Sequence, residues 1–331
     1  MTKQSVFPTS AFRLPRYAFI TIILLLTITV VCINGEGNTK KYTLFSNPQE
    51  VKIQGLPTGA YGRPISTEEP FVSRDGRFLF FNTAQAENNK DLHYAQFINN
   101  KWEYKGEIGP GINNEKEVQA NPTMDKHFNF YYIDSGCVRM AKQGIFSPAT
   151  GKLYKAHEVA GIPKRQLQII GQKVTGNMGV EVNPDGNTLY FSRATWKLKG
   201  TSIAGLAGSD LLVVTKKGKD FVFDKAEAER IMKNINTSDL EYAASISSDG
   251  LEIFFTRLSL ADMEAQKIRS KIMRAQRNSV TSPFGKPEMI KAVGSSHFVE
   301  GPAITPDEKE LYYHKHDGKK FRLFKVTRTI R

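Results

Sequence analysis

Residues 180–191 read VEVNPDGNTLYF, an alternating apolar stretch followed by a turn sequence and an aromatic stretch. Asp and Gly favour tight turns, and the flanking β-branched and aromatic residues favour strands. The segment therefore predicts a β-hairpin with Asp185 at its turn. In such a turn the aspartate accepts hydrogen bonds from backbone N–H groups, so we interpret Asp185 as a structural residue.

The same pattern recurs in four further segments, which align with the first without gaps. They begin at Pro70 (PFVSRDGRFLFF), Ala120 (ANPTMDKHFNFY), Ala244 (ASISSDGLEIFF) and Pro302 (PAITPDEKELYY). Recurrence at this spacing is typical of repeat architectures, in which each unit buries its apolar faces against its neighbours. The five repeats are centred near Asp75, Asp125, Asp185, Asp249 and Asp307.

A third apolar strand follows each hairpin, and a more polar fourth element precedes the next unit. The last unit ends at Arg331 without a fourth element, while an unassigned strand at residues 49–57 precedes the first unit. If that strand completes the last sheet, the units close into a ring with no open sheet edge. We therefore predict an all-β fold, a single five-bladed β-propeller domain over residues 42–331, with six blades as the alternative. The one predicted helix begins at Asp224.

The repeat motif Asn-Pro-Asp-Gly-x-x-Leu-Tyr-Phe resembles the WD-like repeats of the TolB-like β-propeller superfamily. The resemblance covers nearly all of residues 42–331, and residues 183–191 match best. The second unit lacks both Pro and Gly around Asp125, and the fifth has Glu308 in place of Gly. The resemblance implies a propeller. It implies no reaction, because the superfamily includes exported binding or scaffold modules as well as the gating domain of a serine peptidase.

Residues 1–37 predict an export signal, because three cations precede an uncharged, mostly apolar run at residues 17–35. Gly35 and Gly37 offer small residues for a cleavage site, which predicts a periplasmic or secreted protein. An uncleaved anchor that tethers the protein to a membrane through residues 17–35 is the alternative. Lipid attachment at Cys32 is disfavoured, because Val31 departs from the lipobox pattern.

The chain is basic, with 46 Lys and Arg residues against 33 Asp and Glu residues and a net charge of +13. Its cations are dispersed, and the longest basic clusters are pairs such as Lys216-Lys217. No basic stripe with interleaved stacking aromatics occurs, so we predict a solvated charged surface and no nucleic-acid partner.

Charged residues just before each inner strand and just after each aromatic pair are expected at one mouth of the central channel. Carboxylates that alternate with Arg or Lys there would bind a polar ligand such as a glycan or a peptide terminus. Trp196 is a candidate platform for stacking a sugar. The alternative is that the charges pair between blades and stabilise the ring. The candidate ligand-binding residues are Glu69, Glu117, Glu241, Glu300, Arg193, Arg257, His314, Lys315 and Trp196.

Known catalytic motifs, including the nucleophile elbow, the zinc-binding helix and the phosphate loop, are absent from the sequence. His314 and His316 alternate on a strand and could chelate a metal, but such pairs are more often solvated, so we predict no metal and no cofactor. The leading prediction is an exported non-catalytic propeller that binds a partner protein or an envelope glycan at the channel mouth. The alternative is a glycan-active enzyme, a hydrolase or lyase that uses carboxylates at the channel.

Overall fold

The computed structural model describes residues 42–59, 64–86, 89–109, 111–114, 118–141, 156–168, 172–200 and 202–331. The predicted export signal at residues 1–37, the membrane tether and the Cys32 lipidation site therefore lie outside the described residues. Within the described ranges, no helix has the length and apolar character that crossing a membrane requires.

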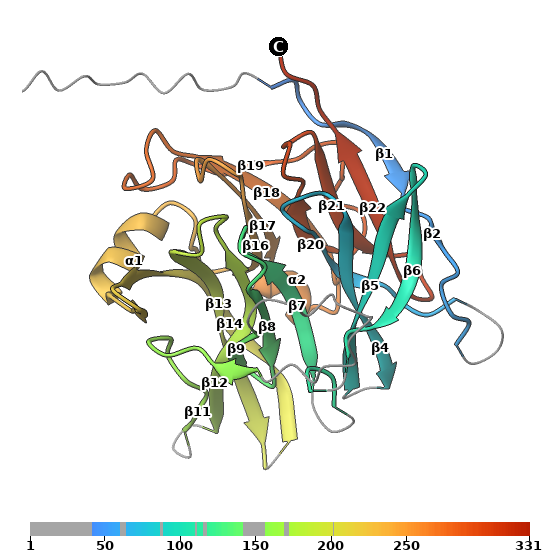
Figure 1. Ribbon diagram of the computed structural model, residues 1–331. Helices are drawn as coiled ribbons and strands as arrows, with labels where there is room; N and C mark the ends of the chain where they lie inside the picture. The colour runs from blue at the N-terminus through green and yellow to red at the C-terminus, as the bar shows by residue number, and fades with distance from the viewer. Residues whose placement is uncertain are drawn as a thin grey trace, which may run out of the picture. The chain divides into compact units, whose positions relative to one another are not determined.

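The described chain consists mainly of antiparallel sheets that follow one another along the sequence (Figure 1). The first sheet has the strand order β2-β6-β5-β4-β3, and the second has the order β10-β9-β8-β7. The strands of the first sheet are β2 (Ile53–Gln54), β3 (Glu68–Val72), β4 (Phe78–Ala86), β5 (Asn89–Ile98) and β6 (Lys101–Glu107). Those of the second are β7 (Gln119–Met124), β8 (Phe130–Asp134), β9 (Cys137–Ala141) and β10 (His157–Glu158).

The third sheet joins two antiparallel units through a single parallel pair, Ser209 of β14 with Leu240 of β16. Its first unit contains β11 (Gln166–Gln168), β12 (Lys173–Val182), β13 (Thr188–Lys199), β14 (Ser202–Lys217) and β15 (Asp220–Val222). Its second unit contains β16 (Leu240–Ile246), β17 (Glu252–Leu258), β18 (Ser270–Gln276) and β19 (Glu288–Met289).

Two helices lie in the connections of this third sheet. The predicted helix is confirmed as α1 (Lys225–Met232), where the Asp224 side chain caps the helix by accepting from Glu227 N at 3.1 Å. Helix α2 (Leu260–Glu264) was not predicted, because its single turn is too short to show an apolar period.

The last sheet has the order β1-β22-β21-β20, so the first described strand lies beside the last one (Figure 1). Its strands are β1 (Ser46–Glu50), β20 (Val299–Ile304), β21 (Glu310–His316) and β22 (Phe321–Thr327). The strand predicted at residues 49–57 is divided in the structure. Strand β1 pairs antiparallel with β22, whereas β2 pairs in parallel with β6 of the first sheet.

The inner strand of each antiparallel unit contacts the inner strands of the units before and after it. The contacts run in the cyclic order β3, β7, β12, β16, β20 and back to β3. Sheets arranged radially around such a centre form a β-propeller, so the predicted all-β propeller fold is confirmed.

The paired aromatic residues explain how neighbouring sheets adhere. Successive strand residues face opposite sides of a sheet. Accordingly, Phe80 packs with Phe130 of the second sheet, while Phe81 packs in a cluster with Tyr312 of the last sheet. All four side chains are at most 3% exposed. Each aromatic pair therefore contributes to two cores at once.

Three of the five hairpin turns, at Asp75, Asp249 and Asp307, have the predicted chemistry. At Asp185 the prediction was wrong, because Asn183 Oδ1 instead accepts from Asn187 N and Thr188 N, both at 2.9 Å. Asp75 accepts hydrogen bonds from Ser73 Oγ at 2.6 Å and Arg77 N at 3.1 Å, and Asp249 accepts equivalent bonds in its own turn. The second turn differs from the gapless alignment. There Asp125 N donates to Asn129 O, as Ser73 N donates to Phe78 O in the first turn. Asp125 therefore occupies the position of Ser73, and its turn is one residue shorter.

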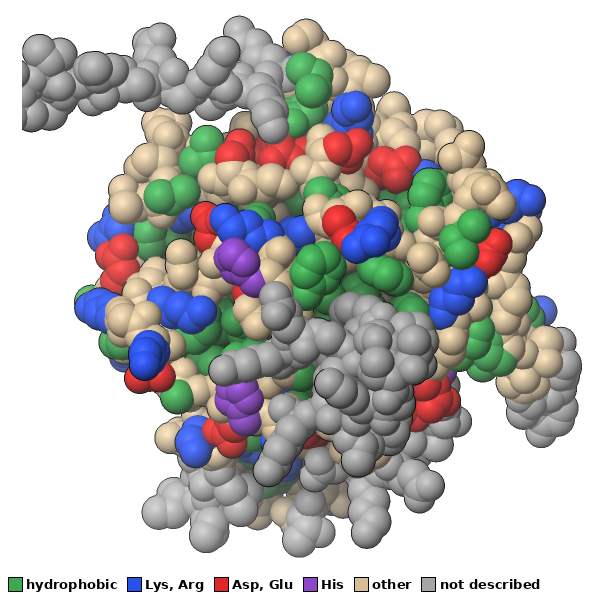
Figure 2. Space-filling model, viewed as in Figure 1, with side chains coloured by type: hydrophobic (Ala, Val, Ile, Leu, Met, Phe, Trp, Pro, Cys, Tyr) green, Lys and Arg blue, Asp and Glu red, His purple; other side chains and the backbone are tan. Residues whose placement is uncertain are grey.

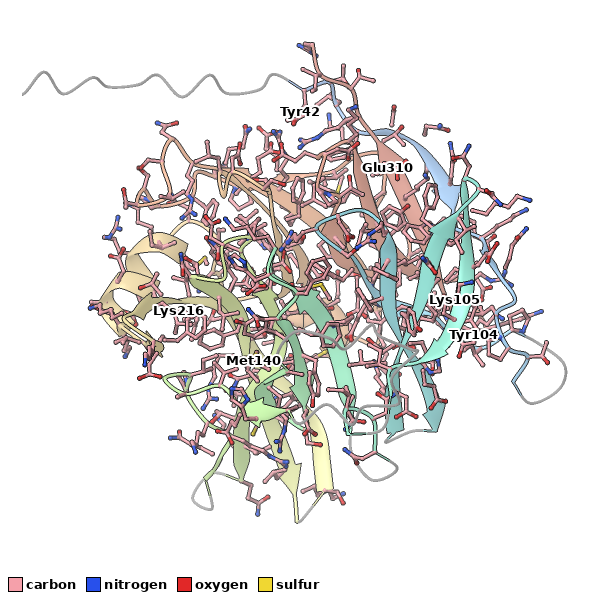
Figure 3. All side chains as sticks on the ribbon, viewed as in Figure 1. Tyr42, Tyr104, Lys105, Met140, Lys216 and Glu310 are labelled. Atoms are coloured by element: carbon pink, nitrogen blue, oxygen red, sulfur yellow. The ribbon has the colours of Figure 1, made fainter. Side chains whose placement is uncertain are left out.

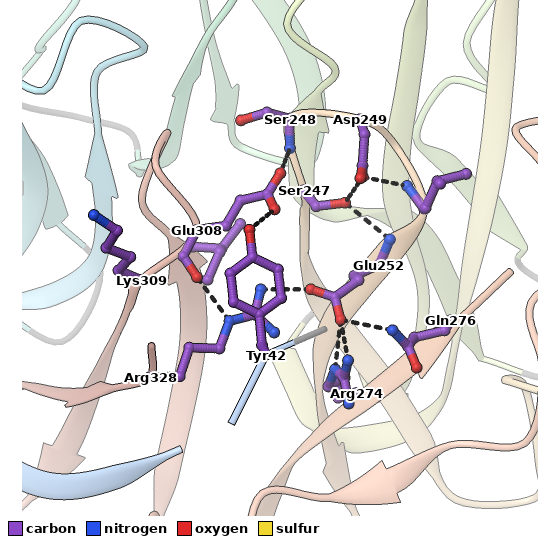
Figure 4. A network of polar contacts seen from close by, with 12 residues as sticks. Tyr42, Ser247, Ser248, Asp249, Glu252, Arg274, Gln276, Glu308, Lys309 and Arg328 are labelled. Atoms are coloured by element: carbon purple, nitrogen blue, oxygen red, sulfur yellow. Dashed lines mark hydrogen bonds and ion pairs between the residues drawn. The ribbon is translucent and has the colours of Figure 1, made fainter. Parts of the chain in front are cut away.

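A largely buried ionic network (Figure 4) joins Tyr42, which Figure 3 labels near the start of the described chain, to the last sheet. Tyr42 Oη donates to Glu308 Oε2 at 2.6 Å, and the Arg328 guanidinium lies 3.7 Å from the centre of the Tyr42 ring. Arg328 also pairs with Glu252 at 2.5 Å, and Glu252 pairs in turn with Arg274. We call these five residues the clasp.

The surface charge follows the prediction of dispersed cations. On the face drawn in Figure 2, Lys and Arg side chains are scattered among acidic ones. This distribution suits a protein whose positive charge acts through its overall field.

Candidate functional site

Backbone hydrogen bonds between neighbouring units define one mouth of the central channel. Each inner strand is bulged near this mouth, and the bulge residue often has the left-handed conformation, with φ of 51° at Glu69 and at Ala243. Ala243 N donates to Ser192 Oγ of the preceding unit at 3.0 Å. Gly301 N likewise donates to Thr256 Oγ1 at 3.1 Å. Side chains of one unit thus hold the bulge of the next.

His314 makes the same contact between the last unit and the first. Its Nδ1 accepts from Glu69 N at 2.9 Å, which leaves the proton of the neutral ring on Nε2. Nε2 therefore donates to Glu300 Oε2 at 3.2 Å. Glu300 also accepts a short hydrogen bond from the Tyr242 hydroxyl. His314 and Glu300 thus hold the backbone of Glu69 in its unusual conformation.

The junction between the first and second units departs from this pattern. Asn82 corresponds in position to Thr256 and His314, but its fully buried amide has no hydrogen-bond partner among the described residues. Instead, the Glu69 carboxylate accepts from Asn121 N at 2.9 Å through Oε2. Glu69 therefore places a carboxyl group at the mouth where another unit would use a hydroxyl group or an imidazole.

Glu69 belongs to a compact group of titratable side chains. Burial raises the pKa of Glu69 above its ordinary value, although the positive charge of Lys90 acts against this rise. Burial lowers the pKa of Lys90, but Glu69, Glu68 and Glu300 outweigh it and raise that pKa. Lys90 is thus a cation, and its Nζ lies 2.6 Å from Glu68 Oε2. A carboxyl group with a raised pKa is suited to donate a proton.

A cavity of about 300 Å³ opens beside this group. Glu69 and Lys90 line it, together with the apolar residues Met178, Val174 and Trp196. A Cβ on Gly176 would lie 3.2 Å from Trp196 Cζ3, so this glycine lets the indole approach the backbone of β12. The cavity therefore combines an acid, a cation and an aromatic surface, a combination typical of polar-ligand sites. We call it the mouth pocket.

Arg193 was predicted to bind ligand directly, but it is not among the residues that line the mouth pocket. Its guanidinium donates to Pro163 O at 3.0 Å and to Lys164 O at 2.8 Å. Asn177 Nδ2 also donates to Pro163 O, at 3.0 Å. These bonds fix the segment that carries Arg165, whose side chain lines the pocket.

The remaining predicted residues divide between structural pairing and positions away from the pocket. Glu241 is completely buried, pairs with Arg257 at 2.8 Å and accepts from Thr237 Oγ1 at 2.7 Å. Lys315 Nζ lies 5.5 Å from the centre of the Phe324 ring. Glu117 lies outside the described residues. Of the predicted set, Glu69 and Trp196 line the mouth pocket.

Sequence reasoning missed Lys90, Arg165, Asn177 and Met178. Lys90 lies on the third strand of the first unit, and Arg165 lies in an insertion that has no counterpart in the other repeats. Neither stands at a position that the repeat alignment marks. Only the strand register, which the alignment does not give, brings them to the mouth.

No protein-family model and no curated protein sequence matches the chain. Several solved structures are similar in fold. The endo-arabinase of Bacteroides thetaiotaomicron is 10% identical, with a TM-score of 0.45 over 83% of this chain and 97% of that one. An α-L-arabinofuranosidase catalytic domain of Coprinopsis cinerea is 13% identical, with a TM-score of 0.42 over 88% and 97%. TolB of Acinetobacter baumannii is 10% identical, with a TM-score of 0.38 over 80% and 55%.

The chain thus spans about half the length of TolB, and a further neighbour is the Dos1 propeller. These likenesses concern the fold, and the TolB-like repeat family stays a resemblance. The prediction of a non-catalytic binding or scaffold protein is contradicted, because glycoside hydrolases predominate among these neighbours. Absent catalytic motifs do not exclude glycoside cleavage, because the paired carboxylates of glycosidases have no fixed sequence spacing.

Proposed function

We propose that the protein is a glycan-active enzyme that cleaves a glycosidic bond in the mouth pocket, with Glu69 as the proton donor. The observation that carries the proposal is the state of Glu69. Glu69 is a half-buried residue whose carboxyl group has a pKa raised by burial, and it lines a cavity large enough for a sugar ring. A general acid for glycoside cleavage needs this combination of retained proton and access.

In this proposal Glu69 gives its proton to the glycosidic oxygen as the bond from that oxygen to the anomeric carbon breaks. The bonding electron pair stays with the departing oxygen. A water molecule then bonds to the anomeric carbon through its oxygen and releases a proton, which restores the neutral acid. Lys90 and Glu68 set the field around Glu69, while His314 positions its backbone.

Trp196 is the side chain that we assign to sugar stacking. It is half-buried beside Val174 and makes no hydrogen bond within the described residues. An indole face binds the apolar side of a sugar ring by dispersion while the ring hydroxyls remain available for hydrogen bonds. Gly136 and Gly176 have no side chains that would crowd the pocket wall or the indole of Trp196.

We propose further that the propeller has five blades, one for each inner strand of the cyclic series, with β1 completing the fifth. This count treats the nine-stranded sheet as two blades, since a single residue pair joins its halves. We also keep the proposal that residues 1–37 export the protein to the periplasm or the exterior. A secreted glycan-active enzyme would meet its polymer there.

The test is release of reducing ends from a panel of plant and bacterial polysaccharides by the full chain, by Glu69→Gln and by Glu229→Gln. Glu229 is an exposed residue of α1 and serves as the matched control. We expect Glu69→Gln to lose about 10²- to 10⁴-fold in kcat, the range that general acids contribute, with Glu229→Gln unchanged. Equal activity of the two variants on every cleaved polymer would refute the role of Glu69.

A further inference from the structure

Arg165 is a cation of the mouth pocket for which the reaction proposed above has no use. Its residue is exposed and lines the same pocket as Glu69 and Lys90. It makes no ion pair or side-chain hydrogen bond with any residue in the described ranges. A guanidinium with five N–H donors thus faces the same cavity as the proposed acid.

The position of Arg165 is supported by its neighbours. Arg193 and Asn177 bind the carbonyl groups of the two preceding residues, as described above, and Asn177 is only 2% exposed. Gly136 has a φ of 88°, and a Cβ there would lie 3.6 Å from Arg165 Cδ. The absence of a side chain at residue 136 therefore leaves space along the stem of Arg165. Such support lowers the entropy lost when the arginine binds a ligand.

The charges of the pocket favour an anionic ligand. Lys90 is balanced by the adjacent Glu68 at 2.6 Å, and the raised pKa of Glu69 reduces the negative charge that it presents. Arg165 is the cation left unbalanced among the described lining residues. Its planar fork matches a carboxylate or a sulfate, to which it can donate two parallel hydrogen bonds.

We propose that the mouth pocket binds a sugar ring that carries an anionic group, with Arg165 as the anchor of that group and Trp196 as the platform of the ring. The proposal rests on the glycan-active function proposed above and narrows its substrates to acidic glycans. Uronic acids and sulfated sugars share this chemistry. Both place a planar or trigonal set of anionic oxygens at the edge of a pyranose ring.

The test measures equilibrium binding of sugars to the full chain by nuclear magnetic resonance titration, so that the result does not depend on turnover. The ligands are galactose, galacturonic acid and galactose 6-sulfate, which differ only at C6, together with the corresponding glucose series. The variants are Arg165→Ala, Arg165→Lys and Arg269→Ala. Arg269 is exposed and outside the pocket, so its replacement removes the same charge elsewhere.

We expect the acidic sugars to bind more tightly than their neutral partners, and Arg165→Ala to weaken them about 10- to 100-fold, as for other charge-assisted contacts. Arg165→Lys should restore part of the affinity, and Arg269→Ala should change little. The uronate and sulfate arms show which anion is preferred. Equal binding of acidic and neutral sugars, no binding of either acidic class, or unchanged affinity in Arg165→Ala would overturn the proposal.

The outcomes for the proposed enzyme and for the proposed ligand class can be distinguished. Arg165-dependent binding of acidic sugars without cleavage of any polysaccharide would support the proposed ligand class and refute the proposed enzymatic activity. Conversely, Glu69-dependent cleavage at equal rates for neutral and acidic glycans would support the proposed enzymatic activity and refute the proposed ligand class.

Discussion

At the scale of single residues, Glu69 combines two features, each of which costs folding free energy. A glutamate at a φ of 51° is strained, and a partly buried carboxyl group loses hydration. Glycine and alanine occupy the equivalent bulges at Gly301 and Ala243, where no charge has to be solvated. Strain that the surrounding hydrogen bonds hold in place is common at functional sites, and His314 and Asn121 supply those bonds here.

The raised pKa of Glu69 makes the stability of the protein depend on pH in a defined direction. Because the folded state favours the protonated acid, its stabilising effect is complete below the ordinary glutamate pKa and is lost as pH rises through the raised value. Glu69→Gln mimics the neutral form at every pH. We therefore expect this variant to gain stability relative to the parent as pH rises, by about 1.4 kcal/mol for each unit of pKa elevation.

Urea unfolding of both proteins between pH 4 and pH 8 measures this difference. Glu229→Gln provides the baseline for losing an exposed carboxylate. Parallel stability curves for the parent and Glu69→Gln would show that the acid is not perturbed by burial.

The interunit hydrogen bonds give a second residue-level prediction. Thr256→Val keeps the shape of the side chain but leaves Gly301 N without its acceptor, which should cost about 1–3 kcal/mol. Asn82→Ala should cost less than Thr256→Val, because the buried amide of Asn82 has no described partner to lose. Chemical denaturation of the two variants compares them. A larger loss in Asn82→Ala would mean that Asn82 does hold a partner in solution.

At the scale of elements, the clasp determines how the first strand is attached. Arg328 is 3% exposed, and its guanidinium lies against Tyr42 and between Glu252 and the Glu308 carbonyl (Figure 4). Removing one partner of a buried ion pair leaves the other charge without compensation. The attachment of β1 to β22 therefore depends on side chains outside the strands themselves.

We expect Arg328→Met to lower the free energy of unfolding by about 3–5 kcal/mol and to make β1 accessible to proteases. Tyr42→Phe, which loses one hydrogen bond and keeps the ring against Arg328, should cost about 1–2 kcal/mol. Arg331→Met, at an exposed position, is the control. Thermal unfolding with limited proteolysis tests the order. If Arg328→Met were as stable as Arg331→Met, the clasp would have no role in holding β1.

The elements also show where sequence reasoning succeeded. Turn residues such as Asp75 and Asp249 act locally, so the pattern around them predicts a hairpin without knowledge of the rest of the chain. The second unit was aligned incorrectly. Asp125 accepts turn hydrogen bonds as the other aspartates do, but it stands at the position of Ser73, and residue type alone does not show this shift. The strand at residues 49–57 was predicted as one element because nothing in its composition shows that its two ends pair with different sheets.

The candidate site was less predictable, because it depends on contacts between units. Glu69 and Trp196 could be proposed from their places in the repeat. The different roles of Arg193 and Arg165 could not be predicted in this way. Arg193 donates its hydrogen bonds to backbone carbonyls, whereas Arg165 lines the pocket. Side-chain charge is visible in a sequence, but whether a partner neutralises that charge is visible only in the fold.

At the scale of the whole molecule, the chain's net charge of +13 should steer anionic substrates toward the protein. If the substrate is an acidic glycan, kcat/KM should fall several-fold as ionic strength rises from about 10 mM to 500 mM, because screening shortens the reach of the field from about 30 Å to a few ångströms. A neutral glycan of the same backbone should show little change. Arg165→Ala should lower kcat/KM on the acidic substrate at all salt concentrations yet keep most of the slope, since it removes the anchor and only one of many charges. Steady-state kinetics on the matched pair separate these contributions, and an identical salt response for acidic and neutral substrates would show that the positive charge serves solubility rather than capture.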